Sequence, residues 1–149
     1  GDTVFPHPVL RELPSMLSLK SGNVFCYTIE TSIAEKVHTM LSLEELNSRM
    51  KDFYDIWLYL SSLAVDRELF TRAVASTFQT TRTAINLNSK FFTETFRSDP
   101  RKQRQWEAFL RKRGIQNAPL EFGKVVSRIL IDLKPIIFKA NQVAAQSEQ

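Results

Sequence analysis

Apolar residues recur at helical spacing from Thr31 almost to the end of the chain, and this periodicity constrains the fold more than any other feature. Start and stop signals divide the pattern into six predicted helices, at about 32–43, 48–63, 66–80, 88–97, 99–113 and 119–133. The last of these helices can also continue past Pro135. Asp99 followed by Pro100, with Gly114 as the stop, gives the clearest boundaries. We therefore expect a mainly α protein built as a helical bundle.

The first thirty residues follow a different pattern. Pro6, Pro8 and Pro14 exclude a long helix there, and residues 23–28 are rich in strand-forming types. Two short strands are only marginally stable by themselves and leave open edges. We expect a short N-terminal β remnant that belongs to the sheet of a larger α/β protein. The predicted division is 1–30 as an extended segment, 31–140 as a helical domain and 141–149 as a polar tail.

Composition narrows the classes of protein and of site. The 149 residues are 43% hydrophobic, which is enough for one sizeable core. A single cysteine, Cys26, excludes an internal disulfide and a Cys-rich zinc site, and two histidines make a His-based metal site a poor expectation. No apolar run approaches the ~20 residues that span a bilayer, and the start of the chain has no signal-peptide pattern. We expect a cytoplasmic protein without a membrane partner.

Two aspartates stand in a helix that is otherwise mostly apolar. In the predicted helix from residue 48, Asp52, Asp55, Tyr59 and Ser62 fall at i, i+3, i+7 and i+10, which is one narrow row. An ordinary solvated pair of carboxylates explains this row, since surface charges are common. Carboxylates that line a cleft and hold a cation explain it equally well.

The preceding predicted helix also has a charged residue, Lys36, next to its apolar side. Ser32 and Glu35 have the spacing of a capping box at its start, and Lys36 borders its apolar side. A lysine at the edge of a core can extend its ammonium to water. Alternatively, the ammonium faces a cleft and contacts a polyphosphate. Periodicity alone leaves both interpretations open.

The predicted helix at 99–113 is strongly basic. Four of its cations fall on the side opposite its apolar residues: Arg101, Arg104, Arg111 and Lys112. Such a face can bind the phosphates of a nucleic acid, and each contact adds a salt-sensitive increment to the affinity. The alternative is a solvated helix surface, because no aromatic residues are interleaved with these cations.

Two motifs connect these observations to a known family. The sequence AEK at 34–36 and the sequence RMKDFYD at 49–55 resemble paired motifs of the AbiEii/AbiGii nucleotidyltransferase toxins. Residues 1–2 resemble the end of that family's sheet motif, residues 27–30 its lead-in to the AEK helix, and residues 105–109 a later helix, so that the resemblance covers nearly the whole chain. It implies an enzyme that transfers a nucleotide from an NTP to an RNA or protein acceptor. It also implies the toxin component of an abortive-infection toxin–antitoxin system used against phage, with an antitoxin protein as a possible partner.

The resemblance also implies roles for individual residues. Lys36 would contact the phosphates of the NTP, and Asp55, with Asp52 beside it, would complete an acidic cluster or orient the attacking group. Arg49 and Lys51 would bind phosphate or pair with these carboxylates. Those five residues are the predicted catalytic and NTP-binding set.

Magnesium is implied for the complete enzyme, because the family's first signature is a Gly-Ser followed by D-x-D or D-x-E on adjacent strands. Nothing of that form precedes Lys36. We therefore expect this chain to be the C-terminal part of the enzyme, without a metal site of its own, and to transfer no nucleotide alone.

Two rival functions remain at this point. One is a non-catalytic helical module that binds RNA or an acidic antitoxin partner, and the other is a purely structural domain with solvated aspartates. A shared location of Lys36 and Asp55 would favour the enzyme, and wide separation would favour the rivals. If Asp55 lies beside other acids, Asp55→Asn should leave the fold equally stable or slightly more stable.

Overall fold

The computed structural model describes residues 28–44, 49–62 and 65–147, and this part of the chain is built from helices without a β-strand. In chain order the elements are α1 (Ile29–Leu43), α2 (Met50–Leu60), α3 (Arg67–Thr80), a short 3-10 helix η3 (Lys90–Phe92), α4 (Glu94–Arg97), α5 (Pro100–Arg113) and α6 (Phe122–Ser147). The mainly helical fold is thus confirmed. The predicted N-terminal β remnant lies, apart from its last residues, outside the described ranges.

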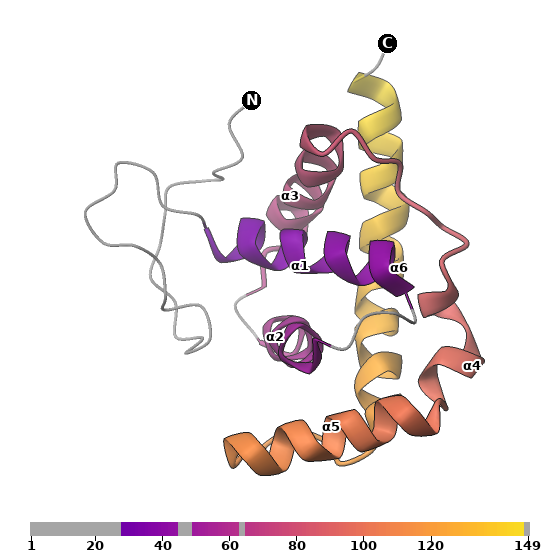
Figure 1. The fold of residues 1–149 in the computed structure, drawn as a ribbon. Helices are drawn as coiled ribbons and strands as arrows, with labels where there is room; N and C mark the ends of the chain where they lie inside the picture. The colour runs from indigo at the N-terminus through magenta and orange to yellow at the C-terminus, as the bar shows by residue number, and fades with distance from the viewer. Residues whose placement is uncertain (1–27, 45–48, 63–64, 148–149) are drawn as a thin grey trace.

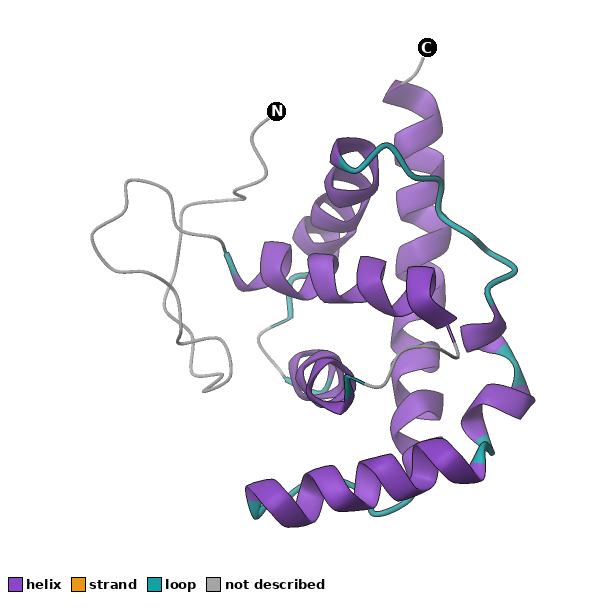
Figure 2. Cartoon of the chain, in the orientation of Figure 1, coloured by secondary structure: helices purple, strands orange, loops and turns teal. Residues whose placement is uncertain are grey.

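Helix α6 is the longest element and runs along the whole helical body (Figure 1). Helix α3 packs against both α1 and α6, and α2 also contacts both of these helices. In the view of Figure 1, α1 runs across α6. Helix α5 lies across the end of the body where α6 begins (Figure 2). The arrangement brings α1 and α2, the two helices with the singled-out charges, into direct contact.

A cluster of aromatic rings joins α2 to the second half of the chain. Phe53 of α2 is fully buried, and its ring centroid lies 5.2 Å from that of Phe122, 6.0 Å from that of Phe96 and 6.2 Å from that of Phe91. Trp106 of α5 is also buried, and its indole N–H donates to the carbonyl of Pro119 at 2.8 Å. Buried rings of this size dominate core energetics, so this cluster holds α2 rigidly against α4, α5 and α6.

Helix α1 begins earlier than predicted. Thr28 is its N-cap, and the Thr28 hydroxyl accepts a hydrogen bond from the Thr31 backbone N–H at 3.1 Å. The capping box predicted for Ser32 and Glu35 is therefore wrong. Threonine is a good N-cap residue, although serine is somewhat better, and the earlier of the two signals is the one used. The first turn of α1 thereby includes Glu30.

The segment predicted as one helix at 88–97 is broken at Thr93. This residue has an extended backbone, with φ −90° and ψ 154°, so η3 ends before it and α4 begins after it. The Thr93 hydroxyl accepts a hydrogen bond from the Phe96 N–H at 3.3 Å. A capping threonine in the middle of an apolar pattern thus interrupts the helix.

Helix α6 begins at Phe122 and continues through Pro135 to Ser147. Proline lacks the N–H that would bond the carbonyl of Ile131, but Pro135 is on the exposed side, where water can reach that carbonyl. Residues 141–147, which we expected in a polar tail, are therefore helical. The division of the chain into domains stays a prediction.

Candidate functional site

Lys36 of α1 forms ion pairs with two aspartates of α2. Its Nζ lies 3.2 Å from Asp52 Oδ1 and 3.2 Å from Asp55 Oδ2. The exposed fractions of the three side chains are 20%, 3% and 0%, respectively. Residues three apart on a helix share a face, and here that face points at α1. The alternative in which both aspartates are solvated is therefore wrong.

Two further cations flank this pair of carboxylates. Arg49 Nε lies 3.1 Å from Asp52 Oδ2, and Lys51 Nζ lies 3.3 Å from Asp55 Oδ2. Arg49 is exposed and Lys51 is partly exposed, so both can also reach a ligand from the solvent side. The structure thus brings together all five residues predicted as catalytic or NTP-binding. With three cations and two carboxylates, this charged cluster carries a net positive charge.

The carboxylates are incompletely satisfied by hydrogen bonds. Asp55 Oδ1 is buried and has no hydrogen-bond partner among the described residues. Asp52 Oδ2 also lacks a hydrogen bond of good geometry within these residues, but Arg49 Nε lies only 3.1 Å away. This ion pair still stabilises the charge of Asp52, since opposite charges attract whatever the angle. Buried polar atoms without partners are uncommon, and they occur often at functional sites.

The polar row of α2 continues into a hydrogen bond that the sequence did not predict. Tyr59 is buried, and its hydroxyl donates to Glu30 Oε2 in the first turn of α1 at 2.9 Å. Glu30 is completely buried as well. A carboxylate at a helix N-terminus is favoured by the helix dipole, which is the one signal that could have drawn attention to Glu30. Asp52, Asp55 and Tyr59 thus all face α1.

Glu35, the middle residue of the AEK motif, lies on the exposed side of α1. Partial desolvation raises the pKa of its carboxylate, and the neighbouring charge of Lys36 acts in the opposite direction. Glu35 therefore takes no part in the contact between α1 and α2.

The geometry of the charged cluster does not suit a magnesium ion. Within the described ranges there is no group of three or more His, Cys, Asp or Glu residues that could hold a metal. In addition, the ammonium of Lys36 takes the position of a cation shared by Asp52 and Asp55. The donor set fits an anion that approaches Lys36, Arg49 and Lys51 better than it fits Mg²⁺.

The four nucleic-acid candidates lie on one exposed face of α5, opposite the buried Trp106 and Leu110. We call this set the basic face of α5, made of Arg101, Arg104, Arg111 and Lys112. Arg101 also pairs with Asp99 at 3.4 Å, whereas Lys102, outside this set, is buried with its Nζ 5.9 Å from the centre of the Phe96 ring. Helix α5 contacts α2, so the basic face belongs to the same helical body as the charged cluster.

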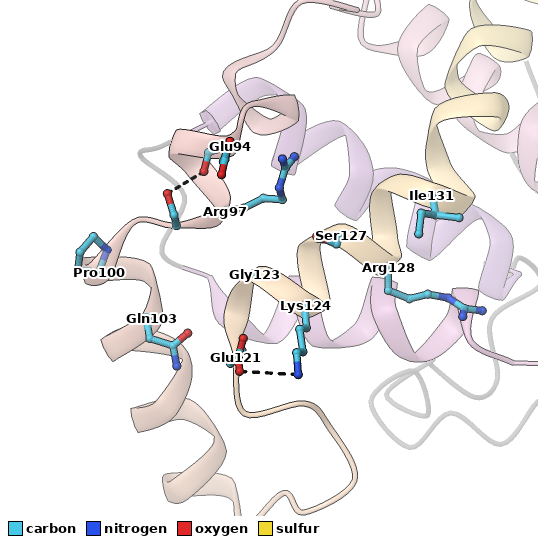
Figure 3. Close-up of a pocket in the computed structure, with 11 residues that line it drawn as sticks. Glu94, Arg97, Pro100, Gln103, Glu121, Gly123, Lys124, Ser127, Arg128 and Ile131 are labelled. Carbon is cyan, nitrogen blue, oxygen red and sulfur yellow. Dashed lines mark hydrogen bonds and ion pairs between the residues drawn. The ribbon is translucent and has the colours of Figure 1, made fainter.

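A surface hollow of about 750 Å³ lies between α4, the start of α5 and α6 (Figure 3). Arg97, Lys124 and Arg128 line it together with Pro100 and Ile131. None of the five residues of the charged cluster lines this hollow. It is therefore a separate surface feature.

Among the described helices, none is both long enough and apolar enough to cross a membrane.

The model of the family described as "Nucleotidyl transferase AbiEii toxin, Type IV TA system" matches residues 1–128 of the 149. No curated protein and no solved structure is similar enough to this chain to count as a match. The family match includes the charged cluster and all of α5, and it ends within the first two turns of α6. The chain belongs to the AbiEii nucleotidyl transferase toxin family of type IV toxin–antitoxin systems.

Proposed function

We propose that the charged cluster, with Lys36 between Asp52 and Asp55 at its centre, contributes to the NTP site of a nucleotidyltransferase that acts on an RNA acceptor. The observation that carries this proposal is the position of Lys36, which is held between two buried carboxylates and keeps a fifth of its side chain exposed. A lysine whose task was only to neutralise buried acids would not need that exposure. The family of the chain supplies the reaction class.

In nucleotidyl transfer, a hydroxyl of the acceptor attacks the α-phosphorus of the NTP, the bond to the β-phosphate oxygen breaks, and pyrophosphate leaves. The enzyme's main tasks are to position the two reactants and to stabilise negative charge. Lys36 would contact phosphate oxygens with its ammonium, and Asp52 and Asp55 would hold that ammonium in one orientation. Arg49 and Lys51 would add charge around the leaving pyrophosphate.

Magnesium, which this chemistry commonly uses, would be held by carboxylates outside the described residues, because the charged cluster does not suit it. The proposal therefore assigns no metal ligand to Asp52 or Asp55. We further propose that the protein acts in the cytoplasm as the toxin of its pair, with an antitoxin as its counterpart, and that the 149-residue chain alone transfers no nucleotide.

The test is binding of each of the four NTPs, measured by calorimetry in the presence of magnesium. Lys36→Met should weaken binding about tenfold or more, since it removes the exposed ammonium, and Lys36→Arg should recover part of the affinity. Lys134→Met, which removes a lysine from the exposed side of α6, is the matched control and should change nothing. Thermal melts of all three variants separate a loss of binding from a loss of folding.

Equal NTP affinity in Lys36→Met and the original protein would refute the assignment of the site. Transfer of label from α-³²P NTPs to an RNA pool is the second readout. Transfer by the isolated chain above a heat-inactivated control would refute the expectation that it is inactive.

A second candidate function is a non-catalytic module that binds RNA. The observation in its favour is that Arg104, Arg111 and Lys112 of the basic face are exposed to solvent. RNA binding that is sensitive to this face, together with no NTP binding by any variant, would favour the second candidate over the first.

A further inference from the structure

We propose that the outer side of α6 binds an acidic, amphipathic segment of another protein. Ile131 and Phe138 are large apolar residues on this side, with exposed fractions of 71% and 58%. They are two helical turns apart and therefore project in nearly the same direction. The opposite side of α6 is the one that packs in the core, through Ile129 and Leu133.

The charges around these two apolar residues are mostly positive. The exposed side of α6 carries four cations: Lys124, Arg128, Lys134 and Lys139. Asp132 is the only acidic residue between Phe122 and Ser147, and it is buried, with ion pairs to Arg67 at 3.1 Å and to Arg128 at 3.0 Å. The exposed side of α6 thus has apolar anchors and an excess of positive charge. Two acids, Glu94 and Glu121, line the adjoining hollow, and Glu121 pairs with Lys124 at 3.7 Å. A second copy of the chain would bring like charges together, whereas an acidic partner would neutralise them.

The hollow of Figure 3 adjoins this surface and gives it a concave part. Figure 3 shows Lys124, Arg128 and Ile131 along one stretch of α6, with Pro100 and Gln103 of α5 on the other wall. An apolar side chain of the partner can enter the hollow beside Ile131, and its acidic residues can then reach Arg97 and Arg128, away from Glu121. An amphipathic helix with apolar residues at i, i+3 or i+4, and i+7 has this distribution.

The two exposed apolar residues favour a protein over a nucleic acid. A protein surface that binds the phosphates of a nucleic acid needs cations, as on the basic face of α5. It does not need exposed isoleucine and phenylalanine side chains. A flat bilayer surface would not follow the hollow beside Ile131. Ile131 and Phe138 also lie beyond residue 128, where the family match ends, so the activity of the family does not account for them. This proposal does not depend on the proposed NTP site.

The probe is a synthetic helical peptide of about three turns (~11 residues) with leucines at i, i+4 and i+7 and glutamates on its other side. A fluorescent label on the peptide allows binding to the 149-residue protein to be followed by anisotropy. The first control is a peptide of the same composition whose leucines do not share a face. We expect the amphipathic peptide to bind and the scrambled one to bind about tenfold more weakly or not at all.

Variants of the protein then locate the binding surface. Ile131→Gln with Phe138→Gln should weaken binding about tenfold or more without lowering the melting temperature, because both side chains are exposed. Lys134→Glu with Lys139→Glu should weaken it and flatten its salt dependence. Arg104→Glu with Arg111→Glu, the matched charge reversal on α5, should leave it within twofold.

Several outcomes would overturn the proposal. The first is that the scrambled peptide binds as tightly as the amphipathic one, and the second is that the amphipathic peptide does not bind. The third is that the Ile131 and Phe138 double variant binds the amphipathic peptide with an affinity within twofold of that of the original protein. Binding of duplex RNA or of phosphatidylserine vesicles that is lost in the same double variant would assign this surface to a nucleic acid or to a membrane instead.

Discussion

Lys36 Nζ lies 3.2 Å from Asp55 Oδ2, and this ion pair ties the middle of α1 to the first half of α2. Asp55 is fully buried, so its desolvation has to be offset by the charges around it. Lys36 and Lys51 provide that compensation from two directions. The same contact that fixes the packing of the two helices therefore fixes the orientation of the lysine proposed to bind phosphate.

Asp55→Asn should lower the free energy of unfolding by about 1–3 kcal/mol, because Lys36 and Lys51 would each lose a charged partner. This reverses our expectation from sequence, which assumed that neighbouring acids repel Asp55. Glu107→Gln on the exposed side of α5 is the control and should change the free energy by less than about 0.5 kcal/mol. Urea unfolding of both variants provides the measurement, and an unchanged midpoint for Asp55→Asn would contradict the structure.

Phe53→Ala should cost about 3–5 kcal/mol, because it opens a cavity among the buried rings of Phe91, Phe96 and Phe122. Phe138→Ala makes the same chemical change at an exposed position and should cost far less. Calorimetric melts of the two variants are compared directly. Similar losses of stability would mean that Phe53 is not at the centre of the core.

Replacement of Arg101, Arg104, Arg111 and Lys112 by glutamine should weaken RNA binding, because the basic face would lose its phosphate contacts. The slope of log K against log salt should become shallower by about 0.7 to 0.9 for each lost contact. Filter binding of an RNA pool over a range of potassium chloride concentrations measures this slope. Lys134→Gln with Lys139→Gln removes charge from α6 and serves as the control. An unchanged slope would leave the basic face as an ordinary solvated surface.

The stability of the fold should fall as the pH decreases below about 6.5, in part because of His38. Desolvation lowers the pKa of His38 from its usual value of 6.5, so the unfolded chain binds a proton more readily than the folded one. This contribution to stability is complete above the unfolded-state pKa and is lost as the pH falls through the folded-state pKa. His38 Nε2 lies 3.0 Å from the Thr83 hydroxyl and 3.2 Å from that of Thr81.

The measurement is the free energy of unfolding in urea between pH 8 and pH 5. His38→Gln should reduce the decline over this range. An identical pH dependence in His38→Gln and the original protein would show that other groups cause the decline.

Helical periodicity correctly indicated which side of a helix is apolar. The stripe predicted in α2 included Met50, Phe53, Ile56 and Leu60, all of which are buried, and Trp57, which is only half-buried. Asp52 and Asp55 could be assigned to one face on the same basis, and the motifs around them indicated the family that the chain belongs to. Helix ends were less predictable, since both Thr28 and Ser32 are possible start signals and Pro135 does not stop a helix on its exposed side.

The sequence by itself determined the helical class of this protein, the faces of its helices and its family, because side-chain spacing within a helix and short motifs are local properties. Only the tertiary structure decided what each face meets. It turned the polar row of α2 towards α1 rather than towards solvent, placed Lys36 between Asp52 and Asp55, and paired Tyr59 with Glu30. The angle between two residues on one helix follows from 3.6 residues per turn. The contact between two helices depends on how the whole core packs, and no local pattern contains that information.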